Sequence, residues 1–92
     1  GLTPTGELAP GLVAQTQQAI ANLEALLATE GASLADVVKT TCFLVHMGDF
    51  AQFNEAYVEA FRGHRPARTT IGVAALPLGA VVEVEAWARV AP

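Results

Sequence analysis

Cysteine is nearly absent from this sequence. Cys42 is the single thiol among 92 residues, which excludes an internal disulfide and a cysteine-rich metal site. No run of about 18 apolar residues occurs, so a membrane-spanning helix is not expected either. Residues 1–7 lack the basic and apolar stretches of a secretory signal. These absences favour a cytoplasmic protein that does not associate with a membrane.

Positive charge is also scarce. Five lysines and arginines stand against nine acidic residues, which gives a formal net charge of −4. The basic residues form no cluster of the kind that neutralises a run of phosphates. We therefore expect no nucleic-acid partner, although one local cation can still bind a small anion.

Apolar residues, in contrast, are abundant: 52% of the chain is hydrophobic and only 15% is charged. A chain of this size forms one domain, here residues 1–92, and buries only roughly 60–65% of the surface that its unfolded form exposes. Surplus apolar surface on a soluble chain usually marks an interface. The composition therefore predicts an oligomer.

Hydrophobic spacing along the chain predicts two helices and three strands. The helices fall at residues 11–29 and between Asp49, which should cap the second helix, and Gly63, and the strands fall at residues 37–45, 68–74 and 81–90. Residues 33–36 resemble a capping box. Residues 3–6 read as a hairpin tip whose preceding strand is absent. Two helices packed on one face of a mixed sheet is the economical α+β arrangement for this order.

The last strand separates into two faces by alternation. Small apolar residues at positions 82, 84, 86, 88 and 90 should pack under the helices, which leaves Glu83, Glu85, Trp87 and Arg89 on the open face. In the strand at 68–74, Thr69, Ile71 and Val73 suit the helix side. We therefore expect Arg68 and Thr70 on the same open face as Glu83. Such a face fits a subunit interface that encloses a polar pocket.

The separation of Arg68 from Glu83 bears on how a pocket would be built. If the last two strands form a direct hairpin, Gly72 lies opposite Glu83, and Arg68 lies on the order of 13 Å further along at ~3.3 Å per residue. That distance is too long for both side chains to hold one small ligand within a chain. We therefore predict that Arg68 of one subunit meets Glu83 of its neighbour.

Three C-terminal motifs resemble the signature of the RidA (YjgF/UK114-like) family. That signature reads PAR-[ST]-x, a short strand, LP, and then a VEIEA-like strand. Here it corresponds to residues 66–70 (PARTT), 73–77 (VAALP) and 79–86 (GAVVEVEA), and further matches precede it in the same order at residues 5–7, 15–23, 31–39 and 49–57. The resemblance covers essentially the whole chain.

The resemblance implies a chorismate-mutase-like subunit in a homotrimer, with sheets inside, helices outside and three pockets at the subunit interfaces. It implies a deaminase that hydrolyses short-chain 2-enamino and 2-imino acids to 2-oxo acids and ammonia, and so protects enzymes that use pyridoxal phosphate. No metal and no organic cofactor is expected. The family's N-terminal β-hairpin, with its GPY-like and SGQ segments, has no counterpart in this chain.

The same resemblance assigns the site residues. Arg68 is the arginine of the PAR motif and would hold the substrate carboxylate, for which its planar fork is suited. Glu83 is the first glutamate of the VEIEA-like strand and would activate the hydrolytic water. Asn54 would lie near the site or support it. Thr70 would contact the substrate at a position where the best-known members carry a cysteine.

Other interpretations of these residues stay open. Glu85 could replace Glu83, Asn54 could serve only the helix, and Trp87 is better explained by interface packing than by substrate contact. Cys42, in an apolar strand, is interpreted as a small buried hydrophobe, and His46 and His64 as surface residues.

Other functions stay open as well. A non-catalytic trimer that binds a small carboxylate is the main alternative. Ribonuclease action is disfavoured by the acidic charge. A pericyclic mutase would need more cations than Arg68.

Overall fold

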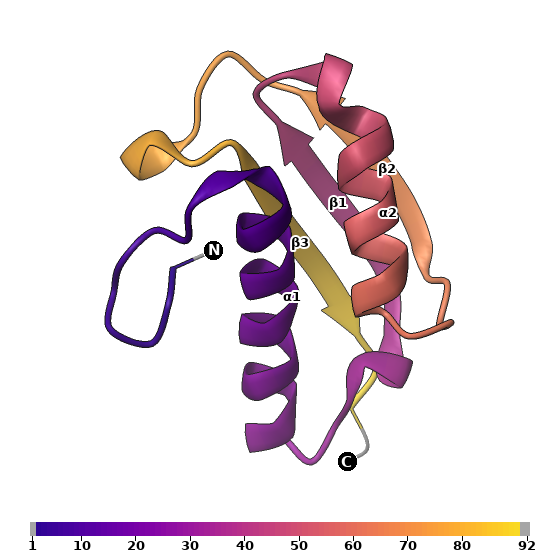
Figure 1. The fold of residues 1–92 in the computed structure, drawn as a ribbon. Helices are drawn as coiled ribbons and strands as arrows, with labels where there is room; N and C mark the ends of the chain where they lie inside the picture. The colour runs from indigo at the N-terminus through magenta and orange to yellow at the C-terminus, as the bar shows by residue number, and fades with distance from the viewer. Residues whose placement is uncertain (1, 91–92) are drawn as a thin grey trace.

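The computed structural model describes residues 2–90, which fold into two helices and three strands (Figure 1). In chain order these are α1 (Gly11–Thr29), β1 (Val37–Leu44), α2 (Phe50–Ala60), β2 (Ala67–Gly72) and β3 (Val82–Ala88). Short 3-10 turns lie at Leu34–Asp36, Met47–Asp49 and Pro77–Gly79. The predicted order of elements is confirmed, and the strand ends differ from prediction by one or two residues.

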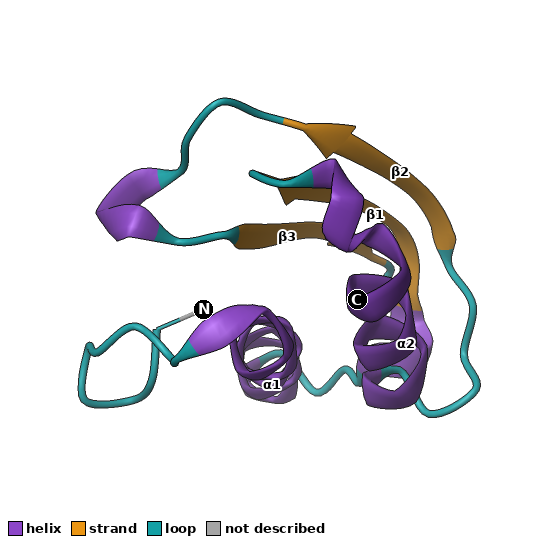
Figure 2. Cartoon of the chain, turned by 45° about the horizontal axis from the view of Figure 1, so that its top comes forward, coloured by secondary structure: helices purple, strands orange, loops and turns teal. Residues whose placement is uncertain are grey.

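The sheet has the strand order β2-β1-β3. β1 runs parallel to β2 and antiparallel to β3, so the sheet is mixed. Both helices cover the same face of the sheet (Figure 2). The predicted α+β arrangement, with two helices on one face of a mixed sheet, is confirmed.

The predicted hairpin between the last two strands is wrong, because β1 lies between β2 and β3. A parallel neighbour needs a crossover, and α2 supplies one from β1 to β2. The chain then passes across the end of β1 through residues 73–81 before β3 begins on the other side (Figure 1). The expected pairing of Gly72 with Glu83 is therefore absent. Gly72 pairs instead with Leu44.

The face assigned to the strand at 68–74 is also wrong. Arg68 pairs with Thr40, and Thr70 pairs with Cys42. Thr40 and Cys42 are fully buried beneath the helices. Paired residues on neighbouring strands share a face, so Arg68 and Thr70 point toward the helices. The assignment for β3 is correct: its first residue, Val82, is buried, while the acidic positions and the tryptophan are exposed.

The core lies between the sheet and the two helices. Its largest fully buried hydrophobic side chains come from every main element except β2: Ile20, Val37, Leu44, Phe53, Phe61 and Val82. Gln15 is a polar residue of α1, yet it is buried. Its Oε1 accepts a hydrogen bond of 2.9 Å from the backbone N–H of Val81. This bond fixes the entry to β3 against α1.

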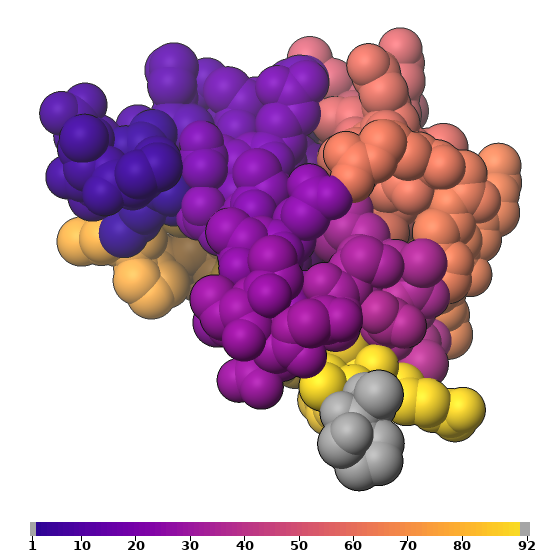
Figure 3. Space-filling model, turned by 90° about the horizontal axis from the view of Figure 1, so that it is seen from below, coloured from indigo at the N-terminus to yellow at the C-terminus, as the bar shows by residue number. Residues whose placement is uncertain are grey.

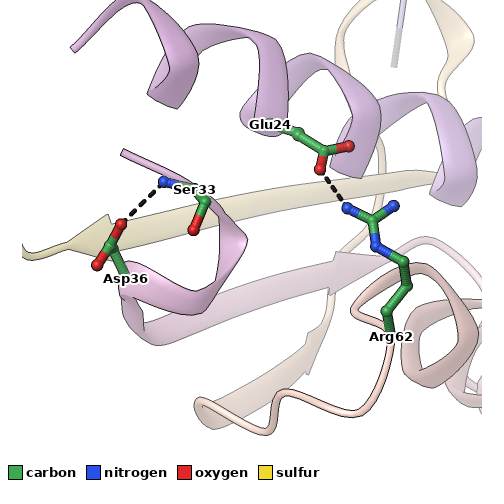
Figure 4. Close-up of polar contacts among 4 residues, drawn as sticks. All are labelled: Glu24, Ser33, Asp36 and Arg62. Carbon is green, nitrogen blue, oxygen red and sulfur yellow. Dashed lines mark hydrogen bonds and ion pairs between the residues drawn. The ribbon is translucent and has the colours of Figure 1, made fainter. Parts of the chain in front are cut away.

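Two polar contacts fix the ends of the helical segments (Figure 4). The backbone N–H of Ser33 donates to Oδ2 of Asp36 at 2.9 Å, as the predicted capping box requires. Arg62, just beyond α2, forms an ion pair with Glu24 of α1. Asp49 precedes α2 but makes no side-chain cap, because a 3-10 turn runs directly into the helix.

Candidate functional site

Arg68 lies against an aromatic surface on α2. Its Cζ is 4.7 Å from the ring centroid of Tyr57, 5.3 Å from that of Phe50 and 5.8 Å from that of Phe53. Its Nη1 donates a hydrogen bond of 2.7 Å to Oδ1 of Asn54. The structure thus brings two of the predicted site residues, Arg68 and Asn54, into direct contact.

The spacing of α2 places these partners on one face. Phe50, Phe53 and Tyr57 are three and seven residues apart, so they project from the same side of the helix. Their rings pack in sequence, with centroids 6.3 Å apart for the first pair and 5.6 Å apart for the second. The contact of this aromatic stripe with Arg68 was not predicted, because the sequence pattern placed Arg68 on the opposite face of the sheet.

A buried hydrogen bond lies beneath the aromatic surface. The hydroxyls of Tyr57 and Thr40 are 2.7 Å apart, and the thiol of Cys42 lies 3.9 Å from the hydroxyl of Thr40. Burial raises the pKa of Tyr57, while the bond to Thr40 and the charge of Arg68 partly offset that rise. Burial also raises the pKa of the Cys42 thiol. Cys42 is therefore a neutral, buried side chain, as interpreted from the sequence.

Thr70 carries a polar atom without a partner. Its Oγ1 is buried and has no hydrogen-bond partner among residues 2–90. An unsatisfied buried hydroxyl costs about 1–3 kcal/mol. It points to the helix side two residues along β2 from Arg68. The hydroxyl therefore has unused hydrogen-bonding capacity on the face of β2 that carries Arg68.

Arg68 has no acidic partner within residues 2–90; the ion pair found there joins Arg62 to Glu24. The half-buried guanidinium contacts a neutral amide and ring faces, which leave its charge unneutralised. Its remaining N–H groups can bind a planar anion such as a carboxylate in bidentate fashion.

Glu83 lies on the other side of the sheet from Arg68. It is exposed on the open face and pairs with Phe43 of β1. Arg68, in contrast, faces the helices. One chain therefore does not bring these two residues together, and the expectation that they share a face is wrong. Their meeting across a subunit boundary stays a prediction.

The open face of the sheet carries large exposed side chains. Trp87 is 50% exposed and Ile71 is 43% exposed. Nζ of Lys39 lies 5.4 Å from the Trp87 ring centroid. Exposed apolar groups gathered with charged ones on a flat face are typical of an interface rather than of a solvated surface.

A hollow of about 350 Å³ lies at the free edge of β3, away from Arg68. Sequence reasoning did not find it. Its lining comes from α1, the N-terminal loop and the segment before β3, and includes Leu2, Leu8, Leu23, Leu26, Leu76, Leu78 and Glu83. The N-terminal loop and the segment before β3 lie next to each other in Figure 3. The lining is mostly aliphatic, so this hollow has little with which to hold a small anion.

The histidines do not form a reactive cluster. His46 is exposed, while Nε2 of His64 lies 2.7 Å from the backbone carbonyl oxygen of Val37, which makes His64 a partly buried structural residue rather than a surface one. Across residues 2–90, no group of three or more His, Cys, Asp or Glu side chains is arranged to hold a metal ion. Neither described helix has the length and apolar character needed to cross a membrane.

Comparison with known sequences gives a consistent set of matches. The family described as Endoribonuclease L-PSP matches residues 1–90. The chain is 46% identical to Protein DfrA of Myxococcus xanthus over 91% of its own length and 65% of the relative's. It is 46% identical to the mouse 2-iminobutanoate/2-iminopropanoate deaminase, over 100% of the chain and 70% of the relative. The putative regulator AldR of Lactococcus lactis is 41% identical over 83% of the chain and 60% of the relative. The chain thus spans about two thirds of the length of these relatives.

Solved structures agree with the sequence matches. A putative endoribonuclease L-PSP from Entamoeba histolytica superposes with a TM-score of 0.92 at 46% identity, covering 98% of this chain and 74% of that one. RidA from an Antarctic Psychrobacter superposes with a TM-score of 0.85 at 44% identity, covering 89% of this chain and 67% of that one.

Proposed function

Because this chain belongs to the endoribonuclease L-PSP family, also called the YjgF/RidA family, we propose that it hydrolyses short-chain 2-imino and 2-enamino acids to 2-oxo acids and ammonia. The mouse relative is named as a deaminase of 2-iminobutanoate and 2-iminopropanoate, which are acids of this class. The chain spans only part of each relative, so its own residues must supply the activity.

The observation that carries the proposal is the unneutralised charge of Arg68. Its guanidinium is half-buried on aromatic rings, bonded to the neutral amide of Asn54, and without an acidic partner among residues 2–90. A 2-imino acid offers one carboxylate, which would complete the charge balance. Holding the carboxylate fixes C2 of the substrate in one place, which reduces the entropy cost of water addition.

Glu83 would act from a neighbouring subunit of a homotrimer. β2 is an edge strand, so Arg68 lies where a second chain can approach. The exposed face that carries Glu83 and Trp87 supplies an apolar surface for such contact. Docking that face beside β2 of the next chain would place Glu83 near the edge of the guanidinium. The pocket would then lie between subunits, with one set of residues from each.

The chemistry needs few groups. An enamine first tautomerises to the imine; water then adds to C2 while Glu83 accepts its proton. The two protons of the water, one held by Glu83 and one on the new hydroxyl, pass to the nitrogen as the tetrahedral intermediate collapses to the 2-oxo acid and ammonia leaves. Arg68 would hold the carboxylate throughout. Thr70 Oγ1, which has no partner among residues 2–90, would bond to the substrate or to the water.

The test is ammonia release from imino acids generated in situ by an amino-acid oxidase. We expect the wild-type chain to accelerate release, and Arg68→Ala and Glu83→Gln to lose the acceleration. The matched controls are Arg65→Ala and Glu85→Gln, which remove exposed charges of the same kind nearby. If a folded wild-type chain does not accelerate ammonia release, the proposal is wrong. If Glu85→Gln loses the activity and Glu83→Gln keeps it, Glu85 rather than Glu83 is the base.

A second candidate function is a regulatory trimer that binds a small carboxylate without turnover. The observation that favours it is the position of Glu83, which one chain keeps on the opposite face from Arg68. Carboxylate binding needs only Arg68 and its support, whereas water activation needs a neighbour. The relative named as putative regulator AldR adds to this case. Pyruvate binding that depends on Arg68, with no ammonia release, would identify this function.

Ribonuclease action, which the family description suggests, receives less support. The formal net charge is −4, and the residues around Arg68 on α2 are aromatic or neutral rather than basic. A phosphate backbone would meet a single cation at this site, whereas nucleic-acid binding needs a row of basic side chains.

A further inference from the structure

The ring of Tyr57 is the closest of the three aromatic rings to Arg68. The guanidinium carbon lies 4.7 Å from its centroid, against 5.3 Å for Phe50 and 5.8 Å for Phe53. The negative face of an aromatic ring attracts a cation placed over it, and more strongly where water is excluded. Tyr57 is buried, so this contact forms in a mostly dry environment.

The Tyr57 ring is fixed from three directions. Its hydroxyl lies 2.7 Å from the hydroxyl of Thr40, and its centroid lies 5.6 Å from that of Phe53 and 4.8 Å from that of Phe61. Thr40 is also the residue of β1 that pairs with Arg68. One residue of the central strand therefore aligns the backbone of the arginine and anchors the ring beneath its side chain.

The contacts to α2 leave part of the guanidinium accessible. Nη1 is occupied by Asn54, and the Tyr57 ring covers one side of the group. Among residues 2–90, Nη2 and Nε have no hydrogen-bond partner. These two parallel donors can therefore bind a carboxylate in bidentate fashion while Nη1 stays bonded to Asn54.

We propose that Tyr57, held by Thr40, is a positioning residue that fixes the guanidinium of Arg68 for carboxylate binding. The proposal rests on the carboxylate-binding role of Arg68 proposed above. Tyr57 does not touch the reacting atoms in this scheme. Its loss should therefore weaken substrate binding and leave the chemical step nearly unchanged.

The kinetic test compares Tyr57→Leu with the control Ile20→Ala. Both changes remove buried apolar volume from the core, but Ile20 lies on α1 rather than on the helix whose rings contact Arg68. We expect Tyr57→Leu to raise KM for the imino acid about three- to tenfold with kcat within about twofold, as the loss of one cation–π contact predicts. Ile20→Ala should lower thermal stability and keep KM. Equal KM values in the two variants would overturn the proposal.

Tyr57→Phe separates the ring from its anchor. This variant keeps the aromatic face but loses the bond to Thr40. We expect it to recover most of the binding lost in Tyr57→Leu, with a KM between those of Tyr57→Leu and the wild type. A KM in Tyr57→Phe as high as in Tyr57→Leu would mean that the ring face contributes nothing, and would contradict the cation–π basis of the proposal.

An NMR arm reads the geometry directly. The chain has four arginines, so the side-chain Nε–H signal of Arg68 can be assigned with Arg68→Lys. Ring currents should shift this signal in the wild type and in Ile20→Ala, and the shift should decrease in Tyr57→Leu, where only the rings of Phe50 and Phe53 remain. Added pyruvate should move the same signal, with weaker binding in Tyr57→Leu. A signal at the same position in Tyr57→Leu would refute the contact.

The same samples separate the two proposals. If pyruvate binds through Arg68 and imino acids are not hydrolysed, the deaminase proposal is wrong. The positioning proposal is then decided by whether Tyr57→Leu binds pyruvate more weakly than the wild type. If the wild type binds no pyruvate, the carboxylate role of Arg68 fails, and the positioning proposal fails with it.

Discussion

Arg68 donates from Nη1 to Oδ1 of Asn54 across 2.7 Å, and this bond joins the start of strand β2 to the middle of α2. The partner is an amide rather than a carboxylate, so the bond orients the guanidinium without neutralising it. That difference matters for a residue proposed to bind an anion, and it can be tested by changing one atom.

Asn54→Asp should replace the neutral bond with an ion pair. The new carboxylate would occupy the guanidinium that the substrate needs, so we expect KM to rise at least about tenfold, the factor for 1.4 kcal/mol of lost binding. The melting temperature should stay level or rise, because the pair is partly buried and well placed. Kinetics and thermal unfolding on one sample check both. Lower KM in Asn54→Asp would contradict anion binding at Arg68.

Thr70→Val should stabilise the chain. The substitution removes a buried hydroxyl that lacks a partner among residues 2–90 and keeps the side-chain shape. We expect a gain of about 1 kcal/mol in the free energy of unfolding, measured by urea titration. Thr69→Val, on the exposed side of the same strand, is the control and should change little. A gain in stability with a loss of activity would support substrate contact by Thr70.

Alkaline pH should weaken the fold through Tyr57. Burial raises its pKa above the ordinary value of 10.0, so the folded state holds its proton longer than the unfolded state. The stability is full below the unfolded pKa and is lost as the pH rises toward the folded pKa, because the unfolded state then releases the proton first. The free energy of unfolding should therefore fall above about pH 10.

Tyr57→Phe is the control for that pH dependence. The chain contains one tyrosine, so this variant removes the phenol titration completely. Its stability should decline less steeply above pH 10, leaving the smaller decline that Cys42, whose pKa is also raised by burial, begins from about pH 9. Urea midpoints measured at intervals from pH 7 to pH 11 give both curves. If the free energies of unfolding of the wild type and Tyr57→Phe fall in parallel with pH, Tyr57 has the same pKa in the folded and unfolded states.

Gly72→Ala should be destabilising through one contact. A Cβ built at Gly72 lies 2.7 Å from Cγ of Met47, which is too close for both to stay in place. Met47 is exposed and can move at modest cost, so we expect a loss of about 1 kcal/mol. The double variant Gly72→Ala with Met47→Ala should recover that loss. If it does not, the cost comes from the strand rather than from Met47.

Trp87 should report assembly. It is 50% exposed in the single chain, on the face proposed to meet a neighbour. If a homotrimer forms, its fluorescence should shift to shorter wavelength as the protein concentration rises, together with the mass measured by light scattering. Trp87→Ala should shift the chain toward monomer. A monomer at all concentrations would remove the support for Glu83 acting across an interface.

The sequence predicted β3 better than β2 for a physical reason. In β3, small apolar residues alternate strictly with Glu83, Glu85 and Trp87, so only one face can be buried. In β2 the order Arg-Thr-Thr-Ile-Gly has little contrast between its faces, and a lone arginine favours the solvent side. The aromatic rings and Asn54 of α2 reverse that preference, and only the tertiary structure brings them to Arg68.

The strand pairing was predicted wrongly because strands that are consecutive in the chain often pair. The sequence of residues 73–81 does not indicate that this segment crosses the end of β1 to the other edge of the sheet. The buried position of Gln15 escaped for a similar reason: its partner is the backbone N–H of Val81, 66 positions away. The assignment of Arg68 and Asn54 to one neighbourhood, however, came from the resemblance to the RidA family, and the structure brings the two side chains into contact. The local sequence pattern thus predicted the helices and strands. Contacts between residues far apart in the chain determine which face of β2 is buried.

The central position of β1 has a consequence for how the chain is made. β1 pairs with β2 on one edge and with β3 on the other, and both follow it in the chain. A growing chain on the ribosome can close the first edge once α2 and β2 have emerged, but the second edge stays open until β3 arrives. During that interval the largely apolar Val37–Leu44 segment presents unpaired backbone groups. Slow synthesis through residues 73–81 would lengthen this exposure and should favour aggregation over folding.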